Sequence, residues 1–84
     1  MEPHKWNIAE RLRTIRQHRG WSQTELGKRS GVHAMLISRI ETGVKKDING
    51  ATLRKLAIAL HVSSDYLLGL REDIESELET AAVA

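Results

Sequence analysis

The stretch SQTELGKRSGVHAMLISRIE, residues 22–41, contains two short helical patterns separated by a glycine turn. Ser22 and Glu25 match a capping box, in which the serine hydroxyl accepts a backbone N–H and the glutamate side chain returns the bond. A helix is therefore predicted over about residues 23–29. Gly31 supplies the left-handed conformation at which a helix ends and the chain turns.

The second helical pattern of this stretch runs from His33 to Glu41 and ends at Gly43. Gly27 leaves room where the two predicted helices cross, and the polar remainder of the second helix faces outward. The residues expected to point inward from the two helices and their turn are Leu26, Val32, Ile37 and Ile40. Two short helices with a tight glycine turn are the layout of a helix-turn-helix. A generic helical hairpin in a small all-α domain is the alternative.

Helical patterns flank the stretch on both sides, so we expect an all-α fold of five helices. The flanking helices are predicted over about residues 8–19, 50–60 and 64–68, with caps at Asn7, Asn49 and Ser63. Trp21 is expected to plug the core between the first two helices. Eighty-four residues suffice for one domain with a modest core. We assign this domain to residues 1–70 and an acidic tail to residues 71–84.

The helical stretch resembles the phage-repressor (Xre or Cro type) helix-turn-helix DNA-binding family. The residues that carry the resemblance are Gln23, Gly27, Gly31, Val32, Ile37, Ile40, Glu41 and Gly43. It extends over roughly residues 7–70 and includes LRKLAIALHVSSDYLL at 53–68. The resemblance implies a compact, lambda-repressor-like five-helix domain in which Arg16 forms an ion pair with Glu41. The chain has His33 where the family usually has Ser or Thr at the start of the recognition helix.

The resemblance also implies which side chains meet DNA. Those expected at base edges are Ala34, Met35, Ser38 and Arg39, and those expected at phosphates are Gln23, Thr42, Lys45 and Lys46. Arg39 can form two hydrogen bonds with guanine O6 and N7, whereas Ala34 and Met35 can only touch thymine methyls or fill space. His33 is expected either to cap the recognition helix or to contact a phosphate.

The charge distribution favours a polyanionic partner. The net charge of +2 divides into twelve Lys/Arg and six Asp/Glu in residues 1–70, and one Arg and five acids in residues 71–84. A basic domain gains affinity for DNA by releasing counterions from phosphates, although a solvated charged face is the simpler alternative.

The residue inventory argues against an enzyme and predicts no cofactor and no metal site. The chain has no cysteine, no HExxH motif, no clustered metal-ligand spacing and no glycine-rich phosphate loop. It also has no apolar run of membrane length and no apolar signal segment at its start, so we expect no membrane contact and a cytoplasmic location.

A homodimer is expected, because one small helix-turn-helix rarely binds tightly enough alone. A two-fold pair would place its recognition helices about 34 Å apart and would require a pseudo-palindromic site. The resemblance implies an interface at Ile58, Ser64, Tyr66 and Leu67. Residues 71–79 carry an amphipathic pattern, so a sixth helix that clasps a partner or folds back is a further option.

Two functions from different classes remain at this point. The first is a sequence-specific transcriptional regulator, most simply a repressor that binds double-stranded DNA as a homodimer and occludes promoters. The alternative is a protein-binding module, such as an antitoxin that neutralises a toxin. The apolar trio at residues 34–36 and the acidic tail keep this alternative open.

Overall fold

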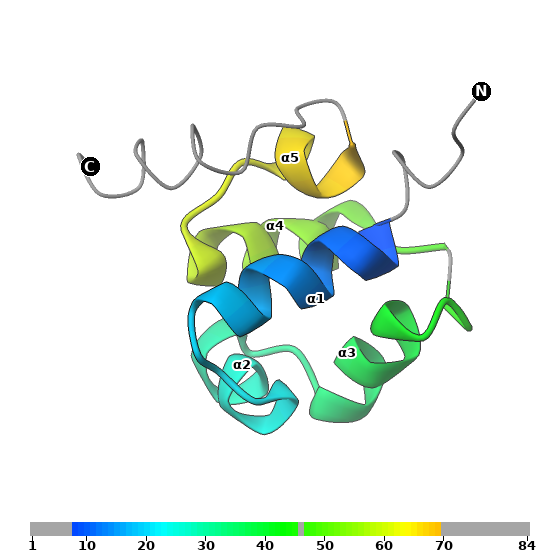
Figure 1. Cartoon of the computed structure of the whole chain (residues 1–84). Coiled ribbons are helices and arrows are strands. Elements are labelled where there is room, and N and C mark those ends of the chain that lie inside the picture. The colour runs from blue at the N-terminus through cyan, green and yellow to red at the C-terminus, as the bar shows by residue number, and fades with distance from the viewer. Residues whose placement is uncertain (1–7, 46, 70–84) are drawn as a thin grey trace.

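The computed structural model describes residues 8–45 and 47–69, and these residues fold into five helices with no strand among them. The helices are α1 (Ile8–His18), α2 (Gln23–Ser30), α3 (Ala34–Glu41), α4 (Gly50–Leu60) and α5 (Ser64–Leu68). The predicted all-α, five-helix fold is therefore confirmed (Figure 1). The predicted cap Asn7 and the option of a sixth helix at 71–79 lie outside the described residues.

Short side chains begin three of these helices, as predicted. A side-chain oxygen accepts the backbone N–H three residues further on, at 2.8–3.0 Å, in Ser22, Asn49 and Ser63. The returning half of the capping box is wrong, because the Glu25 carboxylate accepts instead from Arg29 Nε at 2.7 Å. Glu25 and Arg29 lie one turn apart on α2, where opposite charges attract each other.

The crossing of α2 and α3 depends on the absence of a side chain at Gly27. A Cβ atom there would lie 2.9 Å from the Val32 carbonyl oxygen, which is closer than real Cβ contacts. Gly31 adopts the left-handed conformation with φ 80° and ends α2, while its N–H donates to the Gly27 carbonyl. These two glycines confirm the predicted turn and set how closely the two helices approach.

The core draws buried side chains from all five helices. Its fully buried members are Leu12, Ile15, Leu26, Ile37, Ile40, Leu56, Leu60 and Leu67. In Figure 1, α2 and α3 lie together at one end of the molecule, α5 lies at the other, and α1 runs between them. Trp21 packs against the edge of this core and is only partly buried, so its predicted role as a plug is confirmed in part.

Two side chains of helix α5 that were expected at the surface are buried. Tyr66 and Leu67 are 3% and 0% exposed, so the expectation that they lie at the surface is wrong. The reason is that α5 packs against both α1 and α4, and the Arg11 guanidinium lies over the Tyr66 ring at 5.1 Å from its centre. A five-residue helix is not stable alone and is held here by burying these side chains.

Candidate nucleic-acid interface

A buried ion pair fixes the inner face of α3. Arg16 donates from Nε to Glu41 Oε2 at 2.6 Å and from Nη2 to Glu41 Oε1 at 2.9 Å. Glu41 is buried, and the Arg16 side chain is nearly so. Arg16 Nη1 also donates to the Trp21 carbonyl at 2.7 Å. This pair, expected from the family resemblance, joins α1, the turn before α2 and the end of α3 through one guanidinium.

Gln23 belongs to the same network. Its Nε2 donates to Glu41 Oε1 at 3.0 Å, a bond that the sequence interpretation missed when it assigned Gln23 to a phosphate. The bond spans eighteen residues, so no local pattern announces it. One N–H of the amide is committed to Glu41, while the second N–H and the oxygen are not used by this bond. A phosphate contact by Gln23 stays a prediction.

The outward face of α3 gathers the predicted base-edge residues. Ala34, Met35, Ser38 and Arg39 share one side of the helix, opposite the buried Ile37 and Ile40, and Thr42, which was predicted for a phosphate, follows at the C-cap. Met35 is 58% exposed, although it is apolar. Arg39 is exposed at the far end of the same face, and the Thr42 hydroxyl donates to the Arg39 carbonyl at 3.2 Å. The structure thus presents an apolar patch and a guanidinium side by side along one helix.

His33 begins this helix. Its Nδ1 accepts the backbone N–H of Met35 at 3.1 Å, and its backbone lies outside the helical region at φ −59° and ψ 135°. The predicted capping role is therefore confirmed, with an imidazole nitrogen in place of the usual hydroxyl oxygen. The predicted phosphate contact is not tested by this bond.

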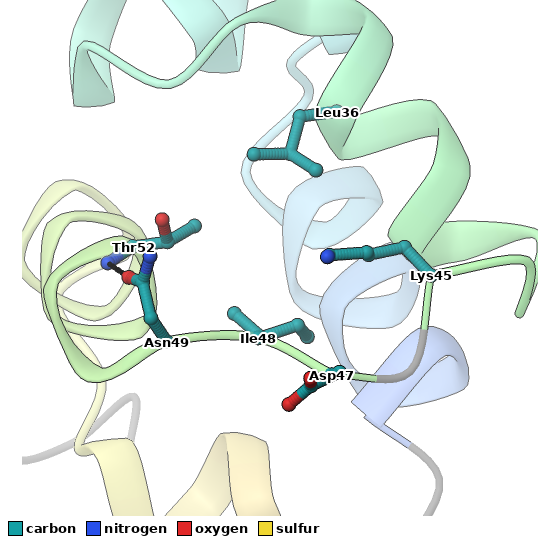
Figure 2. A pocket seen from close by; sticks show the side chains of 6 residues that line it. All are labelled: Leu36, Lys45, Asp47, Ile48, Asn49 and Thr52. Carbon is teal, nitrogen blue, oxygen red and sulfur yellow. Dashed lines mark hydrogen bonds between the residues drawn. The ribbon is translucent and has the colours of Figure 1, made fainter.

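The segment after α3 forms the rim of a hollow of about 370 Å³ (Figure 2). Its lining residues are Leu36, Lys45, Asp47, Ile48, Asn49 and Thr52. Lys45 extends into the hollow, whereas the Asp47 carboxylate points away from it. The Lys45 backbone N–H donates to the Arg39 carbonyl at 3.0 Å, which holds this segment close to the end of α3. Lys46 lies outside the described residues.

The exposed charges of α3 and of the residue Lys45 that follows it are positive, while Asp47 is exposed farther along the segment. The only acidic residue of α3, Glu41, is buried against Arg16, and the exposed Arg39 and Lys45 stand at the end of the helix. Val44, which sequence interpretation did not single out, is exposed beside Lys45. Its only sequence signal is an apolar residue between a glycine and two lysines. The described residues hold no cluster of His, Cys, Asp or Glu that could bind a metal ion.

The residues predicted for a dimer interface divide into two groups. Ile58 on α4 is 66% exposed and Ser64 on α5 is half-buried, whereas Tyr66 and Leu67 are core residues and cannot meet a partner without unfolding α5. Leu68, which was not predicted, is exposed at the end of α5. Among the described helices, none is long and apolar enough to cross a membrane.

Comparison with known proteins places residues 12–67 within the model of the helix-turn-helix family. The chain is 37% identical over 76 residues to the HTH-type transcriptional repressor RghR of Bacillus subtilis (strain 168), covering 90% of this chain and 56% of the relative. It is 29% identical over 68 residues to the HTH-type transcriptional regulator SinR of Bacillus licheniformis, covering 81% of this chain and 61% of that relative.

This chain thus spans somewhat more than half the length of these relatives. No solved structure is a significant match. The family model covers two thirds of the chain, including both helices of the motif and their turn. With α2 and α3 crossing at Gly27 and the outward face of α3 exposed, the chain belongs to the helix-turn-helix family.

Proposed function

We propose that this chain is a sequence-specific DNA-binding transcriptional regulator, most simply a repressor that acts in the cytoplasm. The observation that carries the proposal is the outward face of α3, which has no acidic residue and is held rigidly from behind by Arg16 and Glu41. Two relatives with the same motif are named as a transcriptional repressor and a transcriptional regulator. A rigid, exposed helix of this length fits the major groove of DNA.

Base reading falls to the exposed side chains of α3. Arg39 has the fork geometry to donate to O6 and N7 of guanine, the commonest specific contact in the major groove. Ser38 is half-buried beside it and is suited to a single hydrogen bond. Ala34 and Met35 offer only apolar contact, for which the thymine methyl is the matching group. The chain is thus expected to recognise few base pairs by hydrogen bonds, and the shape of the DNA would supply the remaining specificity.

Residues around the ends of α3 would contact the DNA phosphates and so position the protein on the duplex. Lys45 and Thr42 follow the recognition helix and are exposed, and Lys46 adjoins them in sequence. The remaining amide N–H of Gln23 lies at the first turn of α2. Contacts of this kind set register and orientation on DNA without reading its sequence.

A homodimer completes the proposal, because one motif of this size contacts only half a site. A two-fold pair would place the two copies of α3 about 34 Å apart on a pseudo-palindromic operator. The surface that supports it is now Ile58, Ser64 and Leu68, since Tyr66 and Leu67 are buried. Bound at a promoter, such a dimer would block access to the same DNA.

Salt dependence tests the proposal directly. Binding to a duplex selected from a random library is followed by fluorescence anisotropy at about 50 mM and about 200 mM salt. We expect affinity to fall by about 10³-fold or more, as for six or more phosphates contacted by the dimer. A flat response, or no binding to any duplex at low salt, would favour the protein-partner alternative, for which the exposed Met35 and Val44 supply apolar contacts.

A further inference from the structure

The cap of α3 differs in chemistry from the other caps of the described chain. Ser22, Asn49 and Ser63 accept through oxygen from the residue three positions on, whereas His33 accepts through Nδ1 from Met35, two positions on. A ring nitrogen that accepts a hydrogen bond carries no proton. The neutral imidazole of His33 must therefore hold its proton on Nε2.

In this tautomer, the Nε2–H group of His33 is a hydrogen-bond donor that points away from the helix. The two nitrogens lie on different edges of a rigid ring, so with Nδ1 directed at the α3 backbone, Nε2–H is directed elsewhere. His33 is exposed, and within the described part of the chain its Nε2 has no hydrogen-bond partner. A serine cap also keeps an O–H that can donate, but this group lies close to the backbone at the helix end and reaches less far outward than Nε2–H of His33.

The surroundings of His33 contain cations and no acid. The ring lines a shallow hollow with Met35, Leu36 and Arg39 on the outward face of α3. On its other side it borders the turn, together with Lys28 of α2. No carboxylate of the described residues lines either hollow. No carboxylate of the described residues is placed to accept from Nε2–H, which faces solvent, and an anionic oxygen of a bound partner would suit the neighbouring charges best.

We propose that His33 is a positioning residue for DNA, whose Nε2–H donates to a phosphate oxygen while its Nδ1 caps the recognition helix. The proposal rests on the DNA-binding function proposed above and adds a contact specific to this chain. One imidazole would then both fix the position of α3 along the DNA backbone and stabilise the first turn of that helix. A charge-assisted bond of this kind is about twice as strong as a neutral one.

The variant His33→Ser separates the two roles. Serine already caps α2 and α5 in this chain, so the variant keeps the cap and replaces the far-reaching Nε2–H by a hydroxyl that lies close to the backbone. We expect unchanged thermal unfolding and about tenfold weaker binding to the duplex selected by the wild-type protein. The matched control is His18→Ser, which removes an exposed imidazole from the last turn of α1 and is expected to leave affinity unchanged.

Replacing single phosphates of that duplex by uncharged methylphosphonates identifies the contact. One position per half-site is expected to weaken the wild-type protein about tenfold and His33→Ser hardly at all. Equal losses for the two proteins at every position would overturn the proposal, as would coupling of His33 to a 7-deazapurine instead of a phosphate.

Nitrogen-15 spectra of labelled histidine provide a readout that needs no DNA. We expect Nε2 of His33 to be protonated at neutral pH, and a proton on Nδ1 would overturn the proposal. If the wild-type protein bound no duplex at all, the DNA-binding function itself would fail and the phosphate contact with it. That outcome differs from binding in which no phosphate couples to His33.

Discussion

Helices α3 and α5 are both short and both capped, yet they use their side chains in opposite ways. In α5 the two central residues, Tyr66 and Leu67, are buried between α1 and α4. In α3 the inner face is equally buried, but the outer face leaves Met35 and Arg39 in solvent. Helix α5 therefore serves the fold, while α3 also offers a surface to a partner.

The exposure of the outer side chains, and not helix length or apolar content, therefore distinguishes a helix that can bind a partner from one that only stabilises the fold. Helix α3 can afford an exposed outer face because Arg16 and Glu41 anchor its inner face through two hydrogen bonds. Helix α5 is held through apolar burial and the stacking of Arg11 on Tyr66.

Removal of the α3 anchor is expected to have the largest effect. Glu41→Ala leaves the Arg16 guanidinium nearly buried without its carboxylate, which costs about 3–5 kcal/mol of unfolding free energy. Urea denaturation measures the loss. The control is Glu25→Ala, which breaks the accessible pair with Arg29 and is expected to cost less than about 0.5 kcal/mol. Equal losses would mean that burial of the Arg16–Glu41 pair does not matter.

Truncation in α5 tests whether that helix belongs to the core. Leu67→Ala removes a fully buried side chain and is expected to lower the unfolding free energy by about 2–5 kcal/mol. The adjacent Leu68→Ala removes an identical side chain that is exposed, so its effect is expected to be below about 1 kcal/mol. A larger loss for Leu68 than for Leu67 in thermal or urea unfolding would reverse our description of α5.

The outer face of α3 is expected to affect binding and not stability. Arg39→Ala is expected to cost about 1–3 kcal/mol of binding free energy on the selected duplex and to relax one base pair of its preference. Lys45→Ala is the matched comparison and is expected to weaken all duplexes alike. Selection from random DNA with each variant measures both. If Arg39→Ala lost affinity uniformly, Arg39 would contact phosphate.

A small stability effect is also expected at the exposed surface of α4. Ile58→Glu changes a side chain that is 66% exposed, so the unfolding free energy is expected to shift by less than about 0.5 kcal/mol. If this surface forms the dimer, the variant is expected to be a folded monomer with weaker operator binding, as light scattering and titration would show. Thr14→Glu, on the exposed face of α1, is the control. A dimeric Ile58→Glu would place the interface elsewhere.

Local hydrogen-bond chemistry explains how much of this fold could be predicted. Caps such as Ser22 and Asn49 bind backbone groups three residues away, so their pattern is visible in the sequence. The bond from Gln23 to Glu41 depends on how α2 meets α3, and no local pattern encodes it. The burial of Tyr66 likewise depends on three helices meeting. The outer face of α3 was predictable because helical periodicity alone assigns its sides.

The glycine at the crossing of α2 and α3 has a consequence for how binding preferences can change. Any side chain at Gly27 would push on the Val32 carbonyl and so displace the start of α3. Met35 and Arg39 are exposed and do not lie at this crossing. They can therefore be substituted without changing the angle between α2 and α3. The residue that sets the helix crossing is thus separate from the residues proposed to read bases, so under the proposed function the preferred DNA sequence can change while the fold stays the same.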